Sequence, residues 1–166
     1  DVLRAQKPNI VLILADDLGI GDVGAYRKGP IQTPHIDQLA RNGVRFTQAY
    51  VTHPVCSPSR AGLVTGLYQQ RHGWEFNVAQ RDKEFGMSTE VSTVADTLSE
   101  MGYQNGLIGK WHLGHSNGMS PNDQGFDDSL SLGGSLAAVA IIVKHEIVLA
   151  IIGGLFVFCL LYTSPS

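Results

Sequence analysis

The chain has 166 residues, of which 43% are hydrophobic and 16% charged, values typical of a folded globular domain and not of a disordered segment. Its formal net charge of −3 at pH 7 provides no basic face of the kind that nucleic acids need, so we expect no nucleic-acid partner. The two cysteines, Cys56 and Cys159, stand far apart in the sequence and do not indicate a disulfide framework.

The first predicted elements are a buried strand, a short helix and a second strand. Residues 8–15 (PNIVLILA) form an uninterrupted apolar run rich in β-branched side chains, which predicts a strand buried on both faces, as in a parallel sheet. Thr33 and Pro34 predict the start of a helix that Gly43 ends. Residues 44–50 (VRFTQAY) alternate in polarity, a pattern that predicts another strand.

Two further helices and a strand are predicted next. Pro58 suits the first turn of a helix over residues 57–66, and a hydroxyl cap at residue 92 or 93 predicts a helix that Gly102 ends. Residues 103–109 (YQNGLIG) predict a strand. Because strands alternate with helices, we expect an α/β fold with a mostly parallel central sheet flanked by helices.

The composition changes near residue 133, which divides the chain into a domain over residues 1–133 and an apolar tail over residues 134–166. Residues 147–161 carry no charge, and their apolar continuity predicts a helix, although the run is shorter than the about 20 residues that span a bilayer. The adjacent residues 144–146 (KHE) are costly inside a membrane. Three interpretations of the tail therefore stay open: a membrane segment, a buried core element and a non-native end.

Two adjacent carboxylates, Asp16 and Asp17, come directly after the first predicted strand. In an open α/β sheet, ligands bind at the carboxyl ends of the strands. Neighbouring carboxylates repel each other unless a cation lies between them, and such hard oxygen ligands suit calcium or magnesium. A solvated Asp–Asp turn is the alternative interpretation of this pair.

Residues 56–60 (CSPSR) are the most informative run. Pro58 in the first helical turn places Cys56 just before a helix N-terminus, where the helix dipole and free N–H groups favour an anion. Arg60 can fold back towards Cys56 and adds a planar cation suited to oxyanions. A reactive thiolate and a half-buried structural cysteine are both compatible with this pattern.

Lys110 and His112 follow the predicted strand over residues 103–109. Side chains two residues apart in an extended segment point the same way, so this pair is suited to binding one anion and transferring one proton. A surface lysine beside a structurally bonded histidine is the alternative interpretation.

Five segments in fixed order carry a resemblance to a known family. They are residues 8–19, residues 33–37, residues 56–66 with a C-x-P-x-R signature, residues 106–114 (GLIGKWHLG) and residues 125–127 (GFD). Together they resemble the N-terminal portion of the formylglycine-dependent, arylsulfatase-like sulfatases, which belong to the alkaline phosphatase superfamily. The resemblance covers roughly residues 7–130 and implies an alkaline phosphatase-like fold.

The resemblance implies a nucleophile made by modification. A formylglycine-generating enzyme would oxidise Cys56 to formylglycine, an aldehyde that hydrates to a geminal diol. One hydroxyl would attack the sulfur of a sulfate ester and the alcohol would leave; the second hydroxyl would then lose its proton, sulfate would be expelled and the aldehyde would return. Arg60 would hold the diol, and Lys110 and His112 would contact the sulfate and the modified residue.

The resemblance also implies a metal ion, Ca2+, bound by Asp16 and Asp17 beside the modified Cys56. Family members usually run to several hundred residues and supply further site residues downstream, which we do not find after about residue 129. We therefore expect the chain to carry the nucleophile half of a site and to be inactive by itself.

The implied activity is hydrolysis of a sulfated small molecule or sulfated carbohydrate, and the implied location is exported: periplasmic, secreted or lysosomal. Two alternatives stay open. One is a phosphate or phosphonate ester hydrolase of the same superfamily, because the oxyanions are similar in shape. The other is a membrane-anchored, inactive sulfatase-like protein, which the apolar tail suggests.

Overall fold

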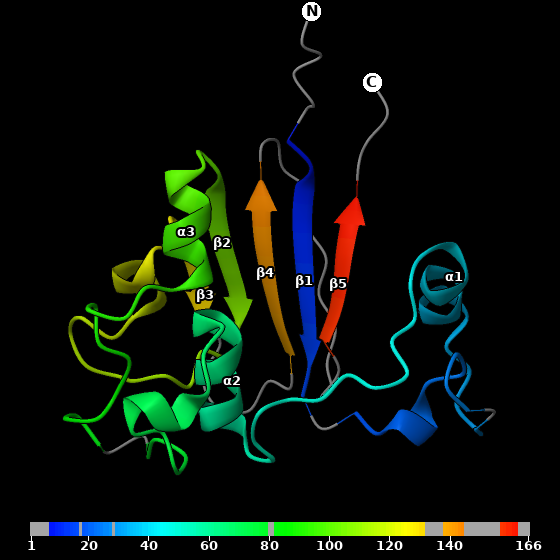
Figure 1. Ribbon diagram of the computed structural model, residues 1–166, viewed down its shortest axis with the longest axis horizontal. Helices are drawn as coiled ribbons and strands as arrows, with labels where there is room; N and C mark the ends of the chain where they lie inside the picture. The colour runs from blue at the N-terminus through cyan, green and yellow to red at the C-terminus, as the bar shows by residue number, and fades with distance from the viewer. Residues whose placement is uncertain are drawn as a thin grey trace, which may run out of the picture.

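A computed structural model describes residues 7–16, 18–27, 29–79, 82–131, 138–144 and 157–162. A central sheet carries α2 and α3 on its left in Figure 1, while α1 stands apart at the other side. The described elements, in chain order, are β1 (Asn9–Ala15), η1 (Ile20–Asp22), α1 (Pro34–Asn42), α2 (Cys56–Thr65), η2 (Gln69–His72), α3 (Val94–Glu100), β2 (Gln104–Gly109), η3 (Pro121–Gln124), β3 (Asp128–Ser131), β4 (Ala138–Lys144) and β5 (Val157–Tyr162).

The strands lie in the order β3-β2-β4-β1-β5 within the part of the chain that the structure describes. β2 pairs with β3 in parallel, β4 pairs antiparallel with both β1 and β2, and β5 pairs antiparallel with β1. The three strands that precede the tail therefore run in one direction, as predicted, while the two tail strands oppose them (Figure 1). The α/β class is confirmed, as are the strands expected over residues 8–15 and 103–109.

The helix predicted over residues 147–161 is wrong where the structure describes it. Val157–Tyr162 is strand β5, whose backbone pairs with β1, and residues 147–156 lie outside the described residues. A short apolar run fits a buried strand as well as a helix, so pairing with a neighbouring strand decides between them. Among the described residues, no helix is long and apolar enough to cross a membrane. The boundary near residue 133 lies outside the described residues and stays a prediction.

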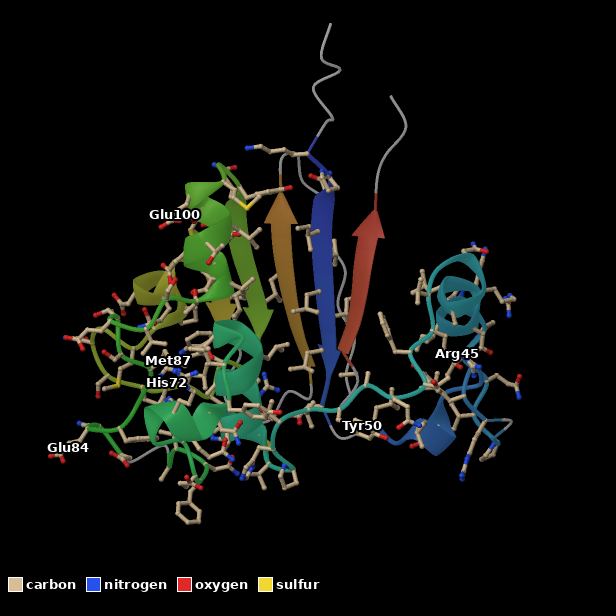
Figure 2. The ribbon with its side chains drawn as sticks, in the orientation of Figure 1. Arg45, Tyr50, His72, Glu84, Met87 and Glu100 are labelled. Atoms are coloured by element: carbon tan, nitrogen blue, oxygen red, sulfur yellow. The ribbon has the colours of Figure 1, made fainter. Side chains whose placement is uncertain are left out.

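The strand predicted over residues 44–50 is also wrong, because this segment forms neither helix nor strand. Val44, Phe46 and Tyr50 are 78%, 64% and 82% exposed, and Figure 2 shows Tyr50 on the segment that runs from the α1 region towards the sheet. Alternating polarity favours a strand only when one face of it packs against other residues. No described strand pairs with this segment, so the pattern has no structural consequence here.

The helix boundaries follow from local chemistry. Thr93 caps α3: its side chain accepts hydrogen bonds from the N–H groups of Ala95 and Asp96, and the Asp96 carboxylate accepts one from Thr93 N–H at 2.7 Å. This reciprocal pair is a capping box, which satisfies N–H groups that the first turn leaves free. α2 ends at Gly66, whose φ of 66° is left-handed and suits glycine at a helix C-terminus.

The hydrophobic core fixes α2 against the sheet. β1 and β2 contribute Leu14 and Leu107, and α2 contributes Ala61 and Val64, all buried in one cluster. Most of α2 is buried, including its first turn from Ser57 onward. This packing places the N-terminus of α2 next to the carboxyl ends of β1 and β2, which lie at the same edge of the sheet (Figure 1).

Candidate active site

An ion-paired cluster lies where β1 and β2 end. Asp16 directly follows β1, and Lys110 directly follows β2. Lys110 Nζ lies 3.2 Å from Asp16 Oδ2, and the Arg60 guanidinium on α2 lies 3.3 Å from the same oxygen. Because β1 and β2 run in the same direction, their carboxyl ends bring together residues 94 apart in the sequence.

Arg60 is held at both ends of its guanidinium. Its second terminal nitrogen donates to the backbone carbonyl of Lys110 at 2.6 Å, and Arg60 and Asp16 are 4% and 6% exposed. A guanidinium with fixed, buried hydrogen bonds has a defined orientation, unlike a surface arginine. The sequence predicted that Arg60 folds back towards Cys56; in the structure its guanidinium contacts Asp16, the residue whose other carboxylate oxygen lies 3.9 Å from Cys56 Sγ.

Cys56 is the first residue of α2 and is half-buried. Its Sγ lies 3.9 Å from Asp16 Oδ1, while Arg60 and Lys110 contact Oδ2 of the same carboxylate. The sequence placed Cys56 just before the helix; the structure shifts it by one position, into the first turn. Asp16, Cys56 and Lys110 therefore meet at one edge of the sheet.

The described cluster is electropositive. Asp16 contributes one negative charge, and Arg60 and Lys110 contribute two positive charges, which leaves a net charge of +1. The N-terminus of α2 adds partial positive charge beside Cys56. An anion placed near Cys56 would balance this charge, and the burial of Asp16 and Arg60 makes electrostatic attraction at the cluster stronger than in bulk water.

His112 is held in an unusual backbone conformation. Its φ is 61°, the one positive value for a non-glycine residue among the described residues, and the Ser57 hydroxyl donates to its carbonyl at 2.7 Å. Such a conformation costs roughly 1–3 kcal/mol and persists where the surroundings impose it. One hydrogen bond therefore joins His112 to Ser57, the residue that follows Cys56.

The ring of His112 has one nitrogen engaged and one unpartnered. Nε2 lies 3.0 Å from the Val78 carbonyl oxygen. A carbonyl only accepts, so Nε2 carries the proton and donates it. In the neutral ring, Nδ1 is then an acceptor, and it is buried with no hydrogen-bond partner among the described residues. Nδ1 is therefore the ring nitrogen of His112 that is able to accept a proton.

The pKa of His112 is lowered below its ordinary value of 6.5. Burial is the largest cause, because it disfavours the charged imidazolium. The hydrogen bond to the Val78 carbonyl opposes this effect, and the positive charges of Lys110, Arg60 and His115 lower the pKa further. His112 is therefore neutral at pH 7, as a proton acceptor must be.

This lowered pKa predicts a pH-dependent stability. Below about pH 6.5 the unfolded chain binds a proton at His112 that the folded chain binds less readily, so the free energy of unfolding falls as the pH falls. Denaturant unfolding between pH 5 and pH 8, in steps, measures this effect. The matched variant is His112→Asn, because asparagine tolerates a left-handed backbone without titrating. We expect a shallower pH dependence in the variant; parallel curves would contradict the prediction.

The described residues test the predicted calcium site only in part. Asp17 lies outside the described residues. Calcium takes about six to eight oxygen ligands, and within the described ranges no group of three or more His, Cys, Asp or Glu side chains gathers as a metal site. Asp16 nevertheless has the right donor chemistry, because its buried Oδ1 is a hard oxygen facing Cys56. Asp16 thus fits calcium as one ligand of a larger set.

Three residues around the site were not predicted from the sequence: Ser57, Asn77 and Val78. The Ser57 backbone N–H donates to Asn77 Oδ1 at 2.9 Å, in addition to its side-chain bond to His112. Asn77 and Val78 belong to a polar stretch without periodicity, so no local signal marks them. Only the contacts between distant segments reveal their positions.

Comparison with known proteins gives consistent results. The sequence model of the sulfatase family matches residues 8–142. An N-acetylgalactosamine-6-O-sulfatase of Bacteroides thetaiotaomicron is 50% identical over 111 residues, which are 67% of this chain and 22% of that protein. Human arylsulfatase A is 45% identical over 130 residues, which are 77% of this chain and 26% of that protein. The chain thus spans about a quarter or less of the length of these relatives.

Solved structures are similar as well. A crystal structure of Ps i-CgsB superposes with a TM-score of 0.72 at 44% identity, covering 78% of this chain and 29% of that chain. The same protein in complex with k-i-k-neocarrahexaose gives a TM-score of 0.69 at 43% identity, over 73% of this chain and 27% of that chain. The PsFucS1 sulfatase from Pseudoalteromonas sp. gives a TM-score of 0.64 at 41% identity, over 72% of this chain and 25% of that chain.

Proposed function

Because this chain belongs to the sulfatase family, we propose that the protein containing it hydrolyses sulfate esters at the cluster around Cys56. One observation carries the proposal: Arg60 and Lys110 share the single carboxylate of Asp16 directly beside Cys56. The two cations suit an anionic ester, and Cys56 stands at a helix N-terminus where a reactive group is favoured.

We assign the nucleophile to Cys56 in its formylglycine form, made by a formylglycine-generating enzyme. One hydroxyl of the hydrated aldehyde attacks the sulfur, the ester S–O bond breaks and the alcohol leaves. The second hydroxyl then loses its proton, sulfate is expelled and the aldehyde is restored. Arg60 stabilises negative charge beside residue 56, and Lys110 binds the sulfate oxygens. His112 accepts a proton at Nδ1, the buried nitrogen left without a partner among the described residues.

We further propose that Asp16 and Asp17, with the modified residue 56, bind calcium in the full-length protein. The ion would supply positive charge at the sulfate oxygens. Asp16 would bind the ion through Oδ1, because its Oδ2 already contacts Arg60 and Lys110. The remaining ligands would come from segments beyond those the structure describes.

The substrate we propose is a sulfated carbohydrate or a sulfated small molecule. The names of two relatives support this class: an N-acetylgalactosamine-6-O-sulfatase and an arylsulfatase. A neighbouring structure holds k-i-k-neocarrahexaose, whose name denotes a carbohydrate of six sugars. An exported location, periplasmic, secreted or lysosomal, belongs to the same proposal.

The test compares esters of sulfate and phosphate. The full-length protein, produced with the modifying enzyme, is assayed with 4-nitrophenyl sulfate, 4-nitrophenyl phosphate and a sulfated oligosaccharide. We expect sulfate ester hydrolysis to dominate, and Lys110→Ala to lower kcat/KM for it about a hundredfold because a cation at the reacting group is lost. Lys83→Ala, which removes an exposed lysine, is the control and should have no effect.

Two outcomes would overturn the proposal. Preferential hydrolysis of the phosphate ester would assign the site to the phosphate and phosphonate ester hydrolases instead. Protein whose residue 56 is fully modified, yet hydrolyses none of the three esters, would remove the enzymatic function and favour the inactive sulfatase-like alternative.

A further inference from the structure

Residues 73–79, which follow η2, contact two parts of the site through Asn77 and Val78. The proposed chemistry gives these residues no role. Trp74 and Val78 in this segment are 1% and 3% exposed, so the core anchors both of its ends. Asn77 lies between these two residues. It is exposed overall, but its side-chain oxygen accepts one hydrogen bond from α2. The segment is therefore held firmly while it presents one polar side chain to α2.

Asn77 replaces a missing helix cap. Val55, the N-cap residue of α2, offers no side-chain acceptor, and a helix leaves its first N–H groups without intrahelical partners. Asn77 Oδ1 accepts the Ser57 N–H at 2.9 Å, from 20 residues further along the chain. Asparagine is among the best acceptors for such groups. The first turn of α2, which carries Cys56, is thus fixed by Asn77 and not by its own cap.

The same segment also holds His112. Val78, the next residue after Asn77, accepts from His112 Nε2 at 3.0 Å. Ser57 connects these two contacts: its hydroxyl donates to the His112 carbonyl at 2.7 Å, and its N–H donates to Asn77. Three segments are therefore joined in one ring of hydrogen bonds: the start of α2, the residues after β2, and the pair at residues 77 and 78.

We propose that Asn77 is a positioning residue that sets the relative placement of residue 56 and the His112 ring. This inference rests on the proposed function, since it concerns the nucleophile and the proton acceptor of that reaction. Asn77 does not need to touch the substrate. Its oxygen orients the backbone of Ser57, and Ser57 in turn orients both its neighbour Cys56 and the backbone of His112.

Two substitutions separate the role of the acceptor oxygen from the role of charge. Asn77→Ala removes the acceptor, and in the full-length protein we expect kcat for a sulfate ester to fall about tenfold to a hundredfold, with KM nearly unchanged, because small misplacements of reacting groups are costly. Asn77→Asp keeps an acceptor and should restore kcat to within about threefold. Its added negative charge should raise KM for the anionic substrate, because like charges repel.

Two controls test whether a change in kcat is specific to Asn77 and independent of the extent of modification at residue 56. Glu75→Ala alters an exposed side chain of the same segment and should change neither parameter. The mass of the residue 56 peptide is measured in every variant, and kcat is calculated per modified molecule. Equal losses of kcat in Asn77→Ala and Asn77→Asp, or an unchanged kcat in Asn77→Ala, would overturn the inference.

A second measurement does not depend on activity. Hydrogen exchange of the Ser57 amide should be about fivefold to tenfold faster in Asn77→Ala than in the wild type, since one hydrogen bond is lost, and close to the wild-type rate in Asn77→Asp. Unchanged exchange in Asn77→Ala would refute the positioning role even in an active enzyme. Absence of sulfatase activity in the wild type, with faster exchange in Asn77→Ala, would refute the proposed function and leave the structural role of Asn77 supported.

Discussion

The peptide spanning Cys56, isolated from full-length protein made alongside a formylglycine-generating enzyme, is expected to be about 18 mass units lighter than its unmodified form, because a CH2–SH side chain becomes an aldehyde. The same peptide should react with hydrazine reagents. Cys56 is half-buried at the first position of α2, with Pro58 and Arg60 at the signature spacing. Mass spectrometry of digested protein measures the change directly.

The second cysteine provides an internal control. Cys159 is followed by two leucines and has no proline or arginine at the signature spacing, so its peptide should keep the mass of an unmodified thiol. Cys56→Ala should abolish turnover in any host, because no nucleophile remains at position 56. Cys56→Ser should do the same unless the host also modifies serine.

A thiolate mechanism makes the opposite prediction. A reactive Cys56 thiolate would be inactivated by alkylating agents and would show the unmodified mass. Active enzyme in which Cys56 is wholly an unmodified thiol would therefore refute the assignment of the nucleophile, even if sulfate esters are hydrolysed.

Removing the carboxylate of Asp16 is expected to have the second large effect. In Asp16→Ala, the buried guanidinium of Arg60 and the partly buried ammonium of Lys110 lose the carboxylate that both contact. Leaving a buried charge unpaired costs about 3–5 kcal/mol of unfolding free energy. We also expect calcium affinity and turnover to fall together, since a hard anionic ligand disappears. Denaturant unfolding, calorimetric titration with calcium and the sulfate ester assay measure the three effects.

A double substitution identifies the cause of the lost stability. Adding Lys110→Ala to Asp16→Ala removes one of the two cations that contacted Asp16, so stability should recover in part while activity stays lost. Glu84→Ala is the control for loss of a carboxylate; Glu84 is exposed and projects from an outer loop (Figure 2). If the double variant is no more stable than Asp16→Ala, loss of the carboxylate between the two cations does not explain the lost stability. Undiminished calcium affinity in both Asp16→Ala and Asp17→Ala would rule out the metal role of this pair.

Several features follow from the sequence alone because their causes are local. The apolar run at residues 9–15 forms β1, Thr93 caps α3 through its own hydroxyl, and Gly66 ends α2 in a left-handed conformation. Each depends on side chains within a few residues of one another. The spacing of Cys56 and Arg60 was likewise enough to indicate an anion site at a helix start.

Other features were decided only when distant segments packed together. The apolar run at residues 157–161 became a strand because β1 offered it a pairing edge. The alternating run at residues 44–50 is exposed, and none of the described strands pairs with it. Hydrophobic periodicity describes which side chains are apolar and not which partner will bury them.

The sequence by itself indicated the candidate site residues of this sulfatase-family chain: a cysteine at a helix start, an arginine four residues on, and a carboxylate and a lysine that each follow a strand. Only the tertiary structure decided how they are arranged. It placed Arg60 and Lys110 on one oxygen of Asp16, from 44 and 94 residues away, and it brought Asn77 to the first turn of α2. The physical reason is that an ion pair or a hydrogen bond depends on distances of a few ångströms, and for residues far apart in the chain those distances are set by how β1, β2 and α2 pack.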